Sequence, residues 1–322
     1  MRNLGGRASF LILGVLVASL LSTGAAAAAG PRYPHQSLGN RGADVRAIQG
    51  FLRHHGATDL AVDGIFGTTT VAAVTAFQTS KGLPVNGRVD GSTWLRLLVR
   101  VQAGSIGEAV SVLQRQIKEK RNVPLVVTGV FDDATRGAVR TFQQHAGLPV
   151  TGVVDTTTWR YLITHFERPV FGAGRVCDYS VGNGPANWGT AAAIGQVEAA
   201  GVRVFELGHG RVAIGDIGHE HGGDIAGHES HELGLDVDVR PMRKLEDQCR
   251  WGVNYRSTSY DRAATRDLVR AIRATAVGHV KVIWFNDPVL IREGLVRWHS
   301  GHDDHLHIRY CEKVHPVDAY DC

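Results

Sequence analysis

The sequence predicts a multidomain protein in which two all-α three-helix repeats precede an α+β domain with an antiparallel sheet. Three observations lead to this prediction. Two stretches in the N-terminal half match at a constant separation, apolar residues in both recur at helical spacing, and residues 235–239 alternate between apolar and acidic. The length of 322 residues also exceeds what one hydrophobic core usually serves.

The first 29 residues have the pattern of a secretory signal peptide. Arg2 and Arg7 form a positive segment before a short apolar run at 10–21, and small residues follow at 25–29. A membrane anchor is the alternative, but the run is shorter than the roughly 20 residues that a spanning helix needs. We therefore expect export, with no stable membrane anchor after cleavage. The formal net charge of +4 is too small to indicate a nucleic-acid partner.

The two repeats are related by one offset without gaps, which indicates a unit duplicated in tandem. The offset is 65 residues for each of the pairs Val62 and Val127, Phe77 and Phe142, and Trp94 and Trp159. Apolar spacing predicts a first helix that ends near Gly56, a second over 70–80 and a third capped by Asp90 or Ser92. We expect the aromatic residues to pack in the helical cores.

The residues of both units carry a family resemblance. The patterns G-x-x-V-x-x-x-Q-x-x-L, V-D-G-x-F-G and F-Q-x-x-x-G-L-P-V-x-G-x-V-D-x-x-T-W resemble the peptidoglycan-binding domain of the three-helix type. The resemblance covers residues 37–99 and 101–164, and it implies peptidoglycan as a partner. The second copy has Thr128 and Asp132 where the first has Asp63 and Gly67. We expect this change to loosen a turn or weaken one binding groove.

The remaining residues, 168–322, form the third predicted domain and hold all four cysteines, Cys177, Cys249, Cys311 and Cys322. An even number of cysteines in an exported chain predicts two disulfides. Sequence allows three pairings, and we favour Cys311 with Cys322 and Cys177 with Cys249. A thiolate metal site is the alternative, but no C-x-x-C spacing supports it.

Two histidine-containing segments of this domain point to metal chemistry. In the first, strand alternation places Asp236 and Asp238 on one face, and Gly234 permits a turn that returns His231 over that face. In the second, the same alternation places His305 and His307 together. Each histidine alone is compatible with an ordinary solvated or hydrogen-bonded group. Together the segments offer two histidines and a carboxylate, the open three-ligand pattern of a catalytic zinc.

The segments S-H-x-x-G-L-D-V-D and G-H-x-x-H-x-H resemble the penicillin-insensitive murein endopeptidases over most of residues 176–311. The resemblance implies zinc as cofactor and assigns the residues as follows: zinc ligands His231, Asp238 and His307; active-site histidines His302 and His305; and outer contacts of the metal site His228 and Asp236. Related carboxypeptidases carry a glutamate where this chain has His302, which favours the endopeptidase branch.

The expected function is hydrolysis of peptide cross-links in peptidoglycan by a secreted enzyme, extracellular, wall-associated or periplasmic according to the host. A D,D- or L,D-carboxypeptidase with the same metal site is one alternative, and a non-catalytic wall-binding protein is another. His305 is the expected general base, while His302 or protonated His305 stabilises the oxyanion. We expect Asp303 and Asp304 to be ordinary surface acids.

Overall fold

The computed structural model describes residues 30–172, 174–180 and 186–322. The predicted signal peptide, residues 1–29, lies outside this part of the chain. Among the described residues, no helix is both long enough and apolar enough to cross a membrane.

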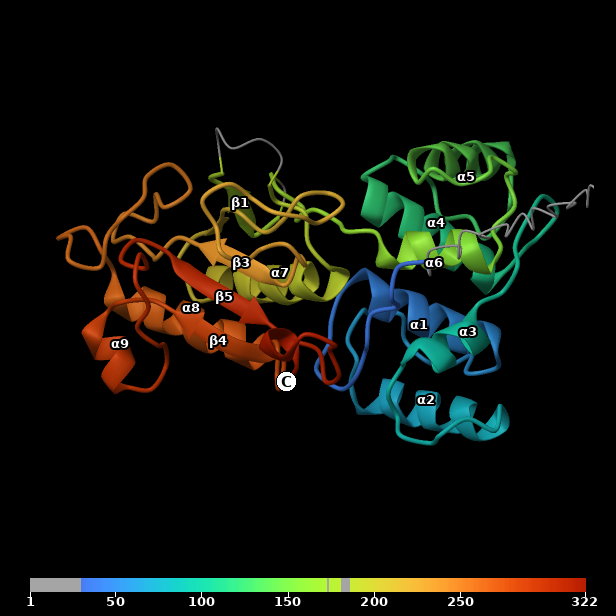
Figure 1. Ribbon diagram of the computed structural model, residues 1–322, viewed down its shortest axis with the longest axis horizontal. Helices are drawn as coiled ribbons and strands as arrows, with labels where there is room; N and C mark the ends of the chain where they lie inside the picture. Colours follow the sequence, from blue (N-terminus) through green and yellow to red (C-terminus); the bar gives the residue numbers. More distant parts are fainter. Residues whose placement is uncertain (1–29, 173, 181–185) are drawn as a thin grey trace, which may run out of the picture.

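Each repeat folds into three helices, and the two repeats share one hydrophobic core beside the C-terminal region (Figure 1). The helices are α1 (Ala43–His54), α2 (Thr68–Ser80) and α3 (Gly91–Leu97), then α4 (Glu108–Arg121), α5 (Asp133–His145) and α6 (Thr156–Thr164). Trp94 and Trp159 are fully buried and donate indole hydrogen bonds to the carbonyls of Pro34 and Val99. The expected core role of the aromatics is confirmed.

The sequence differences between the repeats do not loosen the second one. In the first repeat the buried Gln49 amide donates to Asp63 at 2.7 Å, and in the second Gln114 donates to Thr128 at 3.1 Å. Asp132 accepts a hydrogen bond from the backbone N–H of Thr135 at 2.8 Å and so caps α5. The expectation of a loosened turn was therefore wrong, because each substituted side chain makes its own hydrogen bond.

The C-terminal region is a five-stranded sheet with helices. Its elements are β1 (Val176–Asp178), α7 (Ala191–Glu206), β2 (Val212–Ile214), β3 (Asp236–Val239), α8 (Arg262–Thr275), β4 (Val280–Trp284), α9 (Pro288–Arg292), β5 (Leu306–Tyr310) and a 3₁₀ turn at Asp318–Tyr320. The strand order is β1-β2-β3-β5-β4. Helices α7 and α8 pack against the sheet and share its apolar core (Figure 1).

The predicted fold class is confirmed, with one difference in the sheet. Strands β2, β3, β5 and β4 pair antiparallel, as expected, but the edge strand β1 is parallel to β2. The helix α7 connects β1 to β2 as a crossover, and such a connection returns the chain in the same direction. The sheet is therefore mixed.

The first repeat packs directly on the C-terminal region. At the N-terminus of α1, Gly42 has φ 106° and lies so close to α7 that an added Cβ would meet the carbonyl oxygen of Ala191 at 2.1 Å. A Cβ on Gly195 would likewise meet the Cα of Gly42 at 2.5 Å. The Arg41 guanidinium also donates to the carbonyl of Thr275, the last residue of α8, at 2.9 Å. Glycines at this crossing allow the two helices to approach closely.

Candidate active site

Strands β3 and β5 carry the polar face of the sheet. Their antiparallel register places Asp238 opposite His307 and Val237 opposite Ile308. Side chains alternate along a strand, so Val237 and Ile308 join the apolar core while Asp238 and His307 share the other face. Asp238 and His307 are nevertheless only 5% and 4% exposed. Two ionisable groups are thus withdrawn from water side by side, which requires a compensating cation or donors.

His231 reaches this face through a turn. Gly234 has φ 63°, and His231 itself has φ 81°, a conformation that residues with side chains seldom adopt. The carboxylate of Asp236 accepts a hydrogen bond from the His231 backbone N–H at 3.2 Å and so holds the turn. The His231 Nδ1 lies 3.1 Å from the carbonyl oxygen of Ile217, to which it donates. The proton is then on Nδ1, and the Nε2 lone pair faces the two strands.

Three donor atoms converge at this point. His231 Nε2 lies 3.3 Å from His307 Nδ1 and 3.5 Å from Asp238 Oδ1, and the latter two atoms are 3.1 Å apart. Ligands at about 2.0–2.1 Å from a tetrahedral zinc ion are separated by about 3.3–3.4 Å. Asp238 Oδ1 is buried, and both imidazole nitrogens lie within 3.5 Å of it. The donor types and their spacing therefore fit a zinc ion.

The electrostatics of the face also favour a cation. Burial opposes charge on Asp236 and Asp238, yet their contacts with His307 and neighbouring donors hold the pKa of each carboxyl well below its usual range. Burial likewise opposes charge on His307, but the two carboxylates raise the pKa of that imidazole to about 9. In the metal-free protein His307 thus carries a proton between the carboxylates. A divalent cation at the three donor atoms would replace that proton.

Asp236 orients His307 by contacting its Nε2, on the side of the ring away from Asp238. Its Oδ1 lies 2.9 Å from His307 Nε2 and accepts from Arg309 Nε at 2.8 Å, while its Oδ2 accepts from the hydroxyl of Tyr320 at 2.5 Å. In neutral His307 this contact keeps the proton on Nε2 and directs the Nδ1 lone pair toward Asp238. Sequence reasoning did not predict Arg309 or Tyr320. Arg309 lies two residues after His307 on the same strand, so strand alternation could have predicted that it shares the face of His307. No local sequence pattern predicts the position of Tyr320.

The disulfides explain how Tyr320 arrives there. The chain joins Cys311 to Cys322 and Cys177 to Cys249, which is the favoured pairing. The first bridge closes the C-terminal segment just after β5, and the segment carries Tyr320 back to Asp236. No cysteine in the described part of the chain is free.

His228 lies just outside the three donor atoms. Its Nε2 is 3.0 Å from Asp216 Oδ2, and its Nδ1 is 3.9 Å from Asp238 Oδ2. One of its nitrogens also falls within 4.8 Å of donor atoms of His231 and Asp238. The 3.9 Å distance to Asp238 is longer than those within the triangle of His231, Asp238 and His307. Asp216 holds the far side of the His228 ring.

His305 stands at the open side of the site and is oriented by an acid. Its Nδ1 lies 2.9 Å from Asp304 Oδ1, and its Nε2 lies 4.0 Å from Asp238 Oδ1. Burial opposes charge on this imidazole, but Asp304 and Asp238 outweigh burial and raise the pKa of His305. The expectation that Asp304 is an ordinary surface acid was wrong, because its carboxylate accepts a hydrogen bond from His305 Nδ1.

His302 is close by but differently held. Its ring centroid lies 4.7 Å from that of His305 and 5.6 Å from that of His307, and its Nδ1 donates to the Ser300 carbonyl at 2.8 Å. Burial is the main cause that lowers the pKa of His302 to about 4. It is therefore neutral at pH 7, with the lone pair on Nε2. Asp303 contributes to the structure of the loop, because its Oδ1 accepts a hydrogen bond from the Asn286 side-chain amide at 2.8 Å.

A polar pocket of about 410 Å³ opens beside His305. Its other lining residues are Tyr179, Arg240, Gly252, Val253, Asn254, Ser257 and Asp304. The Arg240 guanidinium stacks 4.1 Å from the ring centroid of Tyr179 and donates to the Gln248 carbonyl at 3.0 Å, which fixes its position. The pocket therefore presents one ordered cation next to the candidate base.

Two family models match this chain. The putative peptidoglycan binding domain matches residues 41–97 and 106–162, and the penicillin-insensitive murein endopeptidase matches residues 183–282. Both matches confirm the resemblances drawn from the sequence. The second match includes His231 and Asp238 but ends before His302, so it is the fold that joins the second histidine segment to the first.

Comparison with individual proteins adds little. The crystal structure of the SleB N-terminal domain is 35% identical to this chain and covers 21% of it and 93% of its own length. Its TM-score to this chain is 0.20. No curated protein matches the chain.

Proposed function

We propose that this chain, which carries two peptidoglycan-binding repeats and a penicillin-insensitive murein endopeptidase domain, is a secreted zinc-dependent endopeptidase that hydrolyses the peptide cross-links of bacterial peptidoglycan. The observation that supports it most is the triangle of His231 Nε2, Asp238 Oδ1 and His307 Nδ1, with edges of 3.1 to 3.5 Å. Three protein ligands leave a fourth position open, as catalytic zinc sites do.

The residues around the triangle suit peptide hydrolysis. A zinc ion bound there would polarise the scissile carbonyl and lower the pKa of water. His305 holds its Nδ1 proton against Asp304, so its Nε2 accepts a proton from the attacking water and returns it to the leaving amine. Asp304 then faces a protonated ring and stabilises its charge. Neutral His302 presents a lone pair rather than an N–H, so the geometry supports protonated His305 as the oxyanion donor.

The repeats and the polar pocket fit a wall polymer as substrate. The repeats place the enzyme on insoluble peptidoglycan, which raises the concentration of cross-links at the site. Arg240 lies in the pocket beside His305 and offers a partner to a carboxylate of the stem peptide.

The test is digestion of purified cross-linked muropeptide dimers, with the products weighed by mass spectrometry. We expect dimers to become monomers, and the activity to be lost with a chelator and restored by zinc. The His305→Ala protein is the control for contaminating hydrolases. Release of a free terminal amino acid, with the cross-link intact, would identify a carboxypeptidase instead. Absence of any hydrolysis by zinc-loaded protein would contradict the proposal.

A further inference from the structure

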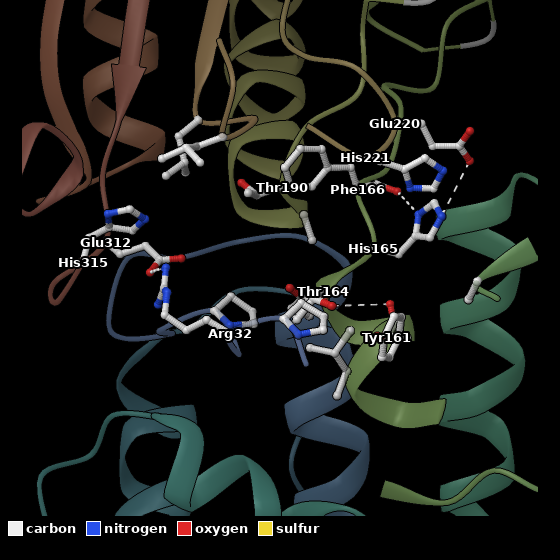
Figure 2. Close-up of a pocket in the computed structure, with 18 of the residues that line it drawn as sticks. Arg32, Tyr161, Thr164, His165, Phe166, Thr190, Glu220, His221, Glu312 and His315 are labelled. Carbon is white, nitrogen blue, oxygen red and sulfur yellow. Dashed lines mark hydrogen bonds and ion pairs between the residues drawn. The ribbon is translucent and has the colours of Figure 1, made fainter. Parts of the chain in front are cut away.

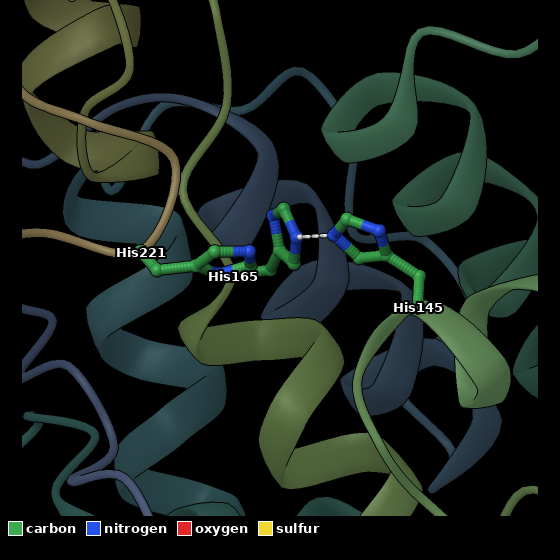
Figure 3. Close-up of side chains that lie close together, drawn as sticks. All are labelled: His145, His165 and His221. Atoms are coloured by element: carbon green, nitrogen blue, oxygen red, sulfur yellow. Dashed lines mark hydrogen bonds between the residues drawn. The ribbon is translucent and has the colours of Figure 1, made fainter.

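A second group of imidazoles lies away from the candidate active site, where the second repeat meets the C-terminal region. His145 is the last residue of α5, His165 follows α6, and His221 lies between β2 and β3 (Figure 3). All three line a cavity of about 750 Å³ between the repeats and the C-terminal region. Figure 2 shows His165 and His221 in this cavity. Neither His231 nor His307 lines that cavity. The cluster is therefore separate from the candidate active site.

His165 is held as metal-binding histidines are. Its side chain is 5% exposed, and its Nδ1 donates to the carbonyl of Phe166 at 2.6 Å. That bond fixes the proton on Nδ1 and leaves the Nε2 lone pair aimed into the cluster, as the Ile217 carbonyl does for His231. The ring lies among His145, His221 and Phe142.

The donor atoms around His165 are spaced like those of the candidate active site. His165 Nε2 lies 3.4 Å from His145 Nε2, and Glu220 Oε1 lies 3.2 Å from the latter and 3.6 Å from the former. Ligands of a tetrahedral zinc ion are about 3.3–3.4 Å apart. A nitrogen of His221 falls within 4.8 Å of the other two imidazoles, so a small side-chain movement brings a fourth donor into place.

We propose that His145, His165, His221 and Glu220 form a second metal site, which takes zinc or a similar borderline divalent cation and fastens the second repeat to the C-terminal region. Four protein ligands fill a tetrahedron and leave no position for substrate, so the site is structural. It goes beyond hydrolysis, because the segment that carries Glu220 and His221 continues to His228 and His231. A metal here would fix that segment against the wall-binding repeat.

Two features decide how readily a metal enters. Burial is the main cause that lowers the pKa of both imidazoles, His145 and His165, to about 4 for His165, and a lowered pKa favours the neutral form that binds metal. Arg121 opposes entry, because its guanidinium pairs with Glu220 and lies 3.2 Å from His165 Nε2. Its side chain is 21% exposed, which allows it to turn toward water. The metal-free protein thus keeps a guanidinium where the cation binds.

Metal analysis of the full-length secreted protein, dialysed against Zn²⁺ alone, tests the proposal. We expect two zinc ions per chain in the wild type, one in His145→Ala, one in His307→Ala and none in the double variant. The His145 side chain is 27% exposed and lies at the end of α5, so its loss should leave the metal-free fold intact, which thermal unfolding in chelator checks. His54→Ala, an exposed histidine of the first repeat, is the matched control and keeps both ions.

The Arg121→Gln variant should strengthen zinc binding at the second site, whereas His145→Ala should abolish it. Because Arg121→Gln removes the competing guanidinium, its second zinc should bind about tenfold more tightly or better, and zinc should raise the Tm of both the variant and the wild type. One zinc per chain in the wild type, lost in His307→Ala and kept in His145→Ala, would overturn the second site while leaving the proposed hydrolase intact. Two ions retained in His145→Ala would also overturn it.

Discussion

Asp238 and His307 face each other directly across the antiparallel strands β3 and β5, and Asp238 Oδ1 lies 3.1 Å from His307 Nδ1. This pairing brings the carboxylate of one histidine-containing segment onto the imidazole of the other. Because both side chains are buried, neither can turn away to water. The fold therefore holds two of the three candidate metal ligands at fixed separation before any metal arrives.

Replacing a candidate ligand should remove one zinc ion from the chain. His231→Ala, Asp238→Ala and His307→Ala each take away one corner of the triangle, and the remaining two donors bind zinc far more weakly. Metal analysis after dialysis should show one ion fewer than in the wild type, with hydrolysis of muropeptide dimers abolished. His305→Ala should keep the full zinc content. Unchanged zinc in all three ligand variants would contradict the assignment.

His305→Ala should lose turnover while it keeps metal and substrate affinity. A positioned general base contributes about 10²–10⁴-fold, so kcat should fall by that factor with little change in KM. His302→Ala is the comparison, because its lone-pair nitrogen lies near the same site. If His302→Ala were zinc-replete and inactive while His305→Ala turned over normally, the base would be His302.

Asp304→Asn should slow the reaction through His305. Loss of the acceptor carboxylate, 2.9 Å from His305 Nδ1, leaves the ring less well oriented, and we expect kcat to fall by about 10–100-fold. The carboxylate raises the pKa of His305, so its loss lowers that pKa. The imidazole then stays neutral to lower pH, and the acidic limb of the pH–rate profile should move to lower pH. A fall in rate with an unmoved limb would assign Asp304 a purely structural part.

Arg240→Gln should weaken substrate binding more than it slows chemistry. If the guanidinium beside His305 pairs with a substrate carboxylate, its loss should raise KM about tenfold or more, the value of one charge-assisted hydrogen bond. Steady-state kinetics on a soluble muropeptide dimer measure this. Arg250→Gln, which removes an arginine stacked on the exposed Trp251 outside the pocket, is the control. Equal kinetics for both variants would exclude Arg240 from recognition.

The repeats should bind the wall independently of catalysis. Full-length His305→Ala protein should co-sediment with insoluble sacculi, because the repeats remain unchanged. The intact chain is the right material, since removal of the repeats would uncover α7 where Gly42 now meets Ala191. Soluble muropeptides in excess should release little of the bound protein. A supernatant that holds all of the protein would show that the repeats do not bind this polymer.

Glu167 should make stability fall as pH rises. This carboxyl is 5% exposed, and burial raises its pKa from 4.5 to about 8, so the folded state holds it protonated. The unfolded chain releases the proton near pH 4.5, and the stabilisation is full below that pH and lost by about pH 8. Glu167→Gln cannot ionise and should be more stable than wild type at pH 8, by on the order of 1–3 kcal/mol.

Urea unfolding of both proteins at pH 5 and pH 8 measures the Glu167 effect. The difference between them should be near zero at pH 5 and appear at pH 8. Glu206→Gln, an exposed acid at the end of α7, should show no such pH dependence. An equal difference at both pH values would mean that Glu167 does not titrate on unfolding.

The sequence alone determined the features that depend on neighbours along the chain. The offset between Trp94 and Trp159 identified the two repeats, and alternation around Asp236 and Asp238 identified the polar strand face. Gly234 marked the turn that returns His231. These features follow from helix and strand periodicity and from backbone sterics, which act over a few residues.

Only the tertiary structure decided which of these faces meet. His231 and His307 are 76 residues apart in sequence, and their nitrogens lie 3.3 Å apart because β3 pairs with β5. Tyr320 reaches Asp236 through the segment closed by the Cys311–Cys322 disulfide, and His145 reaches His165 because α5 and α6 both pack on α4. Such contacts depend on strand order, helix packing and cross-links between distant segments, and local periodicity carries no record of them.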